Sequence, residues 1–115
     1  MTVKAAEILN TAAGLVSGNR QNTHGDKLTN HLCIAEVWNG YLRARKAAGA
    51  ADDLGPDDIA NLMECLKVAR RLTGAFNVDD AVDGAGYAAC YGEIRARMDA
   101  IDRSWADAVK NDAAA

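Results

Sequence analysis

The stretch that decides the fold is IRARMDAIDRSWADAV, residues 94–109. Its large apolar side chains recur every three or four residues: Ile94, Met98, Ile101, Trp105 and Val109. This spacing places them on one face of an α-helix, with charged residues on the other faces. Helical sequence extends back to about Val78 and on to about residue 110. The pattern therefore predicts a long final helix, which projects beyond a small bundle or pairs with another chain.

The same period predicts three earlier helices, at about residues 3–17, from a Thr29 or Asn30 cap to about 48, and at about 56–73. Their expected core stripes are, in order, Ala5, Leu9, Ala12 and Val16; His31, Ile34, Ala35, Trp38 and Leu42; and Ile59, Leu62, Met63, Leu66 and Ala69. No segment alternates like a strand. We expect an all-α bundle of four main helices with a long C-terminal helix, forming one domain over residues 1–111 with a frayed tail at 112–115.

Composition excludes several classes of protein. The net charge is −3, so nothing global favours nucleic-acid binding. No run approaches the roughly 18 apolar residues that a membrane span needs. The three cysteines are widely spaced and stand beside apolar residues, as expected for buried thiols in a reducing compartment. The prediction is a cytoplasmic protein.

The segment NVDDAVDGAGYAAC, residues 77–90, carries an acidic cluster. Asp79 or Asp80 suits the first turn of a helix, where carboxylates favour the helix dipole. Asp83 lies one turn further on and is followed by Gly84 and Gly86, each unfavourable inside a helix. The glycines indicate close approach by a neighbouring backbone or by a ligand. Packing and a binding site both remain open here.

The preceding helix offers a basic complement in ECLKVARR, residues 64–71. Across the turn between the last two helices, Lys67 and Arg70 are expected to face Asp80 and Asp83. Such a pairing forms either a structural salt-bridge network or a wall that binds phosphate. The sequence does not separate the two alternatives.

A third feature is the polar segment RQNTHGD, residues 20–26. Arg20, His24 and Asp26 stand in a connection longer than most between helices, and binding residues concentrate in such loops. The alternative is a solvent-exposed connector. Nucleophile elbows, phosphate loops and dinucleotide fingerprints are all missing from the sequence.

Four motifs, taken in order, carry a resemblance: RQNTHGD, CIAEVWNGYL, DDIANLMECLKVARRLTG and DDAVDGAGYAAC. Together they resemble a family of small proteins from tailed phages and prophages, over about residues 7–94. That family is similar to a distant branch of the all-α nucleotide pyrophosphatases of the MazG type. The resemblance implies a helical, often oligomeric protein that binds a nucleoside triphosphate, with Mg²⁺ as cofactor and metal-dependent pyrophosphohydrolysis as the activity. We expect a homodimer.

The resemblance also implies roles for individual residues. Asp80 and Asp83 match the superfamily's later carboxylate pair, and Glu64 would complete the metal ligands. The superfamily's earlier Glu-Glu-x-x-Glu cluster is reduced here to Glu64 alone, or Glu36 alone. Phosphate contacts would come from Lys67, Arg70 and Arg20, with Tyr87, His24 and Asp26 as further ligand-binding residues.

The phage setting suggests a second class of function. Small acidic helical phage proteins often bind and block host proteins, including CRISPR effector complexes. Such a protein-binding inhibitor of a host defence complex needs only shape and charge, so no motif predicts it. Catalysis is therefore left open by the sequence.

Overall fold

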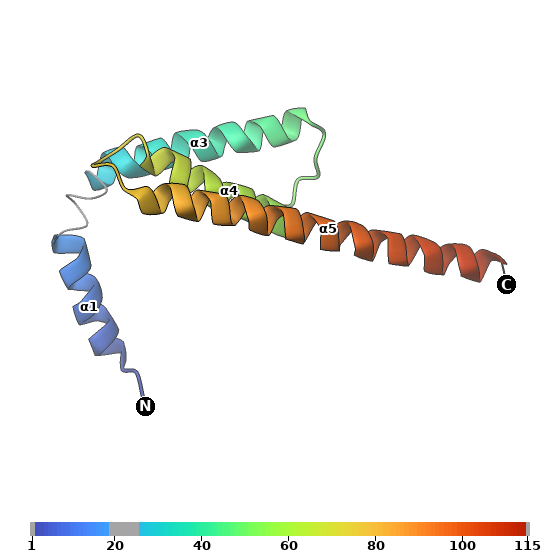
Figure 1. Cartoon of the computed structure of the whole chain (residues 1–115), viewed down its shortest axis with the longest axis horizontal. Helices are drawn as coiled ribbons and strands as arrows, with labels where there is room; N and C mark the ends of the chain where they lie inside the picture. Colours follow the sequence, from blue (N-terminus) through green and yellow to red (C-terminus); the bar gives the residue numbers. More distant parts are fainter. Residues whose placement is uncertain (1, 19–25, 115) are drawn as a thin grey trace.

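A computed structural model describes residues 2–18 and 26–114 of the chain. These residues form helices α1 (Ala5–Ser17), α3 (Lys27–Ala47), α4 (Pro56–Arg70) and α5 (Val78–Ala114), and no strand occurs among them (Figure 1). The all-α prediction and the long C-terminal helix are confirmed. Within the described ranges, no helix is long and apolar enough to cross a membrane.

Local sequence sets both ends of α3. The Asp26 carboxylate accepts a hydrogen bond from the backbone N–H of Thr29 at 3.1 Å, so Asp26 is the N-cap. This corrects the expected cap at Thr29 or Asn30. At the other end Gly49 has a φ of 83°, and the N–H of Ala50 reaches the carbonyl of Arg45 at 3.2 Å. These are the features of a Schellman motif.

Helix α4 begins with Pro56 in its first turn, and the Asp58 carboxylate accepts from the N–H of Gly55 at 2.8 Å. It ends at Arg70, three residues before the predicted end. The chain then turns through Gly74, whose φ is 71°, a left-handed conformation that favours glycine. Helices α4 and α5 form an antiparallel hairpin, and α3 packs on α4 (Figure 1).

The core between these three helices is small. Ala60, Leu62 and Ala69 of α4 are its buried apolar residues, and Trp38 Nε1 donates to the Leu62 carbonyl at 2.9 Å. On α3, His31, Ala35 and Leu42 are exposed, so the predicted core stripe of that helix is wrong in part. The α3 face that meets α4 instead carries polar residues with partners on or just after α4. The examples are Asn30, bonded by Thr73 at 3.2 Å, and Tyr41, bonded to Asp58 at 2.7 Å.

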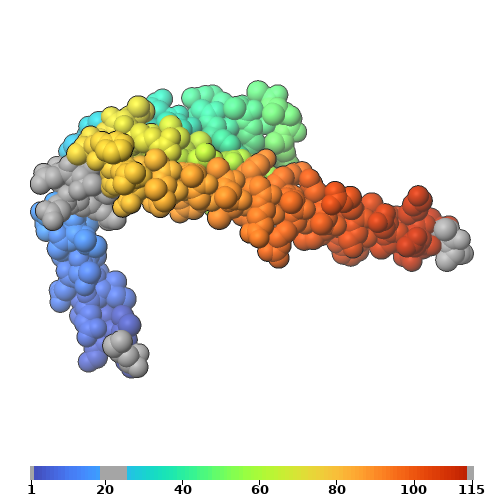
Figure 2. All heavy atoms as spheres, viewed as in Figure 1, coloured from blue at the N-terminus to red at the C-terminus, as the bar shows by residue number. Residues whose placement is uncertain are grey.

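The packed unit leaves much of the chain exposed. Every residue of α1 is exposed, although its stripe was expected in the core, and so is every described side chain of α5 beyond Asp99 (Figure 2). The molecule measures 66 × 43 × 25 Å, with a radius of gyration of 19.8 Å. A compact domain of this length has about 13 Å. The three cysteines are free, with Cys33 and Cys65 half-buried; Cys90 is exposed, contrary to the expected buried thiol.

Candidate functional site at the turn between α4 and α5

The turn from α4 into α5 encloses a cavity of about 170 Å³. It is lined by Arg70, Arg71, Ala75, Phe76, Asn77, Asp80 and Ala81. Arg70 is the last residue of α4, Arg71 is the C-cap residue that follows it, and the first turn of α5 supplies Asp80. The space is smaller than an ordinary small-molecule site, about 300 Å³ or more, and suits a group the size of a phosphate.

Arg70 and Phe76 give this cavity its chemical character. Arg70 is half-buried, and its buried Nε has no hydrogen-bond acceptor within the part of the chain that the structure describes. A buried guanidinium N–H without an acceptor favours binding of an anion, because a buried donor that makes no hydrogen bond is costly. The Phe76 ring is 91% exposed beside it. An exposed aromatic ring next to an arginine offers a stacking surface for a planar group such as a nucleobase.

Arg71 lies across the start of α5. Its Nη2 donates to the backbone carbonyl of Asp80 at 3.4 Å, and it approaches α5 at Gly84. A Cβ on Gly84 would lie 2.5 Å from that nitrogen, so the glycine makes room for the arginine. A Cβ on Gly86, by contrast, would have no described atom within 4 Å. The close approach predicted for the two glycines therefore occurs at Gly84, and a side chain makes it.

Lys67 and Asp83 form an ion pair at 3.0 Å between α4 and α5. Lys67 is mostly buried and Asp83 half-exposed. Of the two predicted partners of the acidic pair, Lys67 therefore takes Asp83. Arg70 makes no ion pair with Asp80 or Asp83, and Asp80 is nearly buried, at 4% exposure, in the cavity wall.

The described residues do not fit the metal site that the resemblance implies. In residues 2–18 and 26–114, no three acidic, histidine or cysteine side chains come together in a way that could hold a metal ion. Asp83 is committed to Lys67, and Glu64 lies on α4 without joining Asp80 in such a group. A hard divalent cation needs several oxygen ligands at once, so we derive no step through Mg²⁺.

The other predicted ligand residues are placed apart from the cavity. Asp26 caps α3 through Thr29, and its carboxylate is occupied there. Tyr87 is half-buried on α5, one turn beyond Asp83. Arg20 and His24 lie outside the described residues. Among the predicted ligand-binding residues that the structure describes, Arg70 lines the cavity, and Asp80 of the predicted metal ligands lines it as well.

The sequence predictions did not include five of the lining residues: Arg71, Ala75, Phe76, Asn77 and Ala81. Arg71 was placed in the basic segment 64–71 without a role of its own, and the third helix was expected to end at about residue 73. The sequence did contain one signal for Phe76. It is the chain's one phenylalanine, a residue type that is usually buried, and it stands between alanine and asparagine in a turn.

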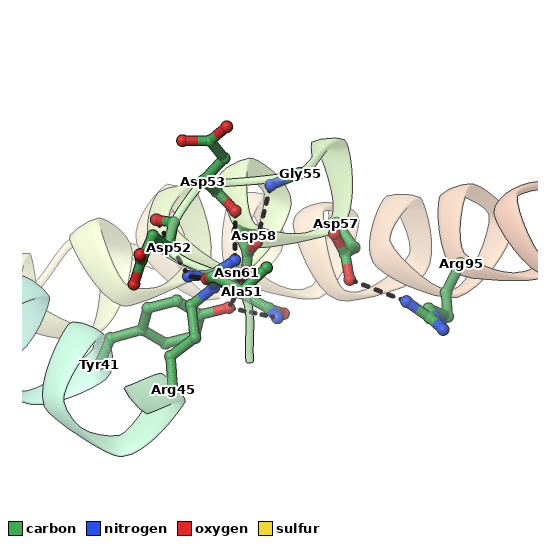
Figure 3. A network of polar contacts seen from close by, with 10 residues as sticks. All are labelled: Tyr41, Arg45, Ala51, Asp52, Asp53, Gly55, Asp57, Asp58, Asn61 and Arg95. Carbon is green, nitrogen blue, oxygen red and sulfur yellow. Dashed lines mark hydrogen bonds and ion pairs between the residues drawn. The ribbon is translucent and has the colours of Figure 1, made fainter. Parts of the chain in front are cut away.

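A second polar cluster lies at the opposite end of α4 (Figure 3). Arg45 Nε lies 3.0 Å from an Asp58 carboxylate oxygen, and its guanidinium also donates to the carbonyls of Ala51 and Asp53. Tyr41 donates to Asp58 and accepts from Asn61 at 3.1 Å. Arg45 thereby ties the 51–53 segment to α3 and α4. These contacts are internal, so the cluster is structural.

The pKa of Asp58 reflects this environment. Burial alone would raise it, but hydrogen bonds from the Gly55 N–H, Tyr41 and Arg45 outweigh burial and hold the pKa below its usual 3.8. Burial and the neighbouring Asp58 carboxylate raise the pKa of Tyr41. At neutral pH the pair is therefore a carboxylate bonded by a neutral phenol.

These observations define an all-helical protein, with a hairpin of α4 and a long α5 and a small basic cavity at its turn. The chain belongs to the DUF6378 family, described as a domain of unknown function, whose model matches residues 7–111. It is 37% identical to the Gene 55 protein of Mycobacterium phage L5 over 81 residues, 70% of this chain and 47% of that protein. It is 33% identical to the Gene 55 protein of Mycobacterium phage D29 over 87 residues, 76% of this chain and 52% of that protein.

The chain thus spans about half the length of the curated relatives it matches. No solved structure matches it at a significant level. The expected relationship to a phage protein family is confirmed. Similarity to MazG-type pyrophosphatases stays a prediction.

Proposed function

We propose that the protein binds a nucleotide, with a phosphate group in the cavity at the α4–α5 turn. One observation carries this: the buried Nε of Arg70 has no hydrogen-bond acceptor among residues 2–18 and 26–114, and it belongs to a cavity that Arg71 also lines. Guanidinium groups hold phosphate through charge-assisted hydrogen bonds. Phe76, exposed at the rim, supplies a surface on which the base stacks.

The proposal is for binding. Hydrolysis of the MazG type would need carboxylates that gather a metal ion, and Asp83 is paired with Lys67 instead. Lys67 supports the site indirectly, because its ion pair joins α4 to α5 one turn from Arg70 and Arg71.

The test is calorimetric titration with nucleoside triphosphates, nucleoside monophosphates and inorganic phosphate, each with and without magnesium. Arg70→Gln should weaken binding about tenfold or more, the usual scale for losing a hydrogen bond to a charged group. Arg103→Gln, on the exposed far part of α5, is the matched control and should bind like the wild type. Phe76→Ala should weaken nucleotide binding and leave phosphate binding unchanged.

A panel that gives no binding heat would overturn the proposal. So would equal losses in Arg70→Gln and Arg103→Gln, since that would reflect overall charge. A pyrophosphate-release assay on the same samples tests the predicted MazG-type hydrolysis separately.

The second expectation, an inhibitor that binds a host defence complex, depends on an exposed surface able to take a partner. Exposed apolar residues on α1 and α5 provide such a surface. A second copy of the chain can cover the same surface, and binding of a host protein instead is one outcome of the oligomeric-state test.

A further inference from the structure

Two apolar helix faces are left uncovered. The first is on α1, where Ile8 and Leu15 are exposed and a shallow hollow of about 450 Å³ lies between Val3, Ile8 and Leu15. The second is on residues 100–114 of α5, which we call the overhang. Its exposed stripe is Ile101, Trp105 and Val109, with Trp105 at 71% exposure.

The overhang continues the packed face of α5. Ile94 and Met98 on the same stripe are half-buried, and a Cβ on Gly55 would lie 3.7 Å from Met98 Cε. Gly55 immediately precedes the first residue of α4, so α4 begins beside Met98, and the apolar stripe of α5 beyond Met98 has no part of α4 alongside it. The apolar pattern does not stop where its partner helix does, which indicates that another helix covers the remainder.

The amount of exposed surface indicates a large partner. The chain exposes 8537 Å², whereas a folded monomer of 12.2 kDa exposes about 6,100 Å². The excess is about 2,400 Å² per chain. Two chains that each bury this area fall within the range of roughly 2,000–5,000 Å² for obligate dimers. A second copy of the chain meets this requirement.

The two faces also match in length and are separated in space. α1 has 13 residues and is about 20 Å long, and the overhang is about 22 Å long. Within one chain they project from opposite ends of the packed unit (Figure 1). A pair of α5 helices would leave α1 uncovered, and a pair of α1 helices would leave the overhang uncovered. In a two-fold dimer in which α1 of each copy packs on the overhang of the other, both apolar faces of both copies are covered.

We propose that the protein is a homodimer in which α1 of each copy packs on the α5 overhang of the other. Trp105 of one copy lies against the hollow between Val3, Ile8 and Leu15 of its partner. The contact is reciprocal, so each copy contributes one α1 face and one overhang. The nucleotide proposal is independent of it, since neither face includes Arg70 or Phe76.

The test uses Ile8→Glu on α1 and Trp105→Glu on the overhang, both at exposed positions outside the core. Light scattering after size exclusion should give the wild type twice 12.2 kDa and each variant 12.2 kDa. Ala6→Glu and Ala100→Glu place the same charge on the opposite faces of α1 and α5 and should stay dimeric. Circular dichroism checks that all four variants keep the helix content of the wild type.

Mixing the two variants is the decisive step. The Trp105→Glu chain still has an intact α1, and the Ile8→Glu chain an intact overhang, so one of the two contacts can form. Native mass spectrometry with one chain tagged should detect the heterodimer, with a weaker dissociation constant than the wild type. Failure of the mixture to associate would overturn the exchange.

The remaining outcomes also decide. A monomeric wild type overturns the proposal and leaves the faces for a different protein, such as a host factor. A dimeric Ile8→Glu points to pairing of α5 helices, and a dimeric Trp105→Glu to pairing of α1 helices; either overturns it. A wild-type mass above twice 12.2 kDa excludes a closed two-fold dimer.

Discussion

Arg71 and Gly84 meet where α4 and α5 come closest to the turn. The arginine Nη2 stands 2.5 Å from the position that a Cβ on Gly84 would take. From there the guanidinium reaches the Asp80 carbonyl. Gly84, in the second turn of α5, lowers the helix propensity there, and its lack of a side chain leaves room for the Arg71 guanidinium in the cavity wall.

Gly86→Ala should be more stabilising than Gly84→Ala. Alanine gains about 1 kcal/mol of helix propensity over glycine. At Gly86 nothing lies within 4 Å of the new methyl group, so the whole gain is kept and Tm rises by about 4 °C. At Gly84 the methyl group displaces Arg71 and part of the gain is lost. Thermal unfolding at one fixed protein concentration measures the difference, and an equal rise in both variants would contradict the argument.

Hydrophobic periodicity predicts the helices here because each runs for at least 13 residues and carries apolar side chains at intervals of three and four. It fails on which face of α3 is packed, since Asn30, Tyr41 and Arg45 turn inward to polar partners. A burial pattern made by polar residues has no hydrophobic signal. It also fails to show that Ile101 and Trp105 lie beyond α4, because periodicity does not report how far the neighbouring helix extends.

The candidate site was predictable to the extent that helix spacing controls it. The expectation that basic residues of α4 face Asp80 and Asp83 depends on a hairpin turn, which the sequence predicts. The particular partners depend on side-chain reach across that turn. Lys67 takes Asp83, and Arg71 lies against Gly84 and Asp80 where Arg70 was expected. The two arginines are adjacent in sequence, so the prediction was wrong by one residue at the end of α4.

The Lys67–Asp83 ion pair should contribute modestly to stability. Asp83 is 48% exposed, so solvent screens the pair and a coupling of about 0.5 kcal/mol is expected. A double-mutant cycle with Lys67→Met and Asp83→Asn, measured by urea unfolding, isolates the coupling from the single-residue effects. The coupling should shrink in high salt. Repeating the cycle with Lys110, on the exposed overhang, in place of Lys67 should give no coupling at either salt concentration.

Asp58→Asn should cost about 3 kcal/mol at neutral pH, because it leaves the mostly buried Arg45 guanidinium without its carboxylate. Since the folded-state pKa lies below 3.8, the part of this stability that depends on the ionised Asp58 carboxylate is present above about pH 3.8 and is lost as pH falls through the folded-state pKa. Urea unfolding from neutral to acidic pH should show the wild type and Asp58→Asn converging in acid.

The control for Asp58 is Asp53→Asn, on the same segment. The Asp53 side chain is exposed and points away from the cluster in Figure 3. It should change stability by less than about 0.5 kcal/mol and leave the acid limb unchanged. Parallel curves for the wild type and Asp58→Asn at every pH would show that Asp58 has no depressed pKa.

Tyr41→Phe separates the phenol from the rest of the cluster. It removes the hydroxyl that donates to Asp58 at 2.7 Å and accepts from Asn61, for a cost of about 1 kcal/mol. With that donor gone, the pKa of Asp58 rises toward its usual value, so the acid loss of stability should begin at a higher pH than in the wild type. The same urea series measures both effects. A loss of stability at neutral pH without a displaced acid limb would mean that Tyr41 stabilises the fold by packing, and that Gly55 and Arg45 alone hold the Asp58 carboxylate ionised.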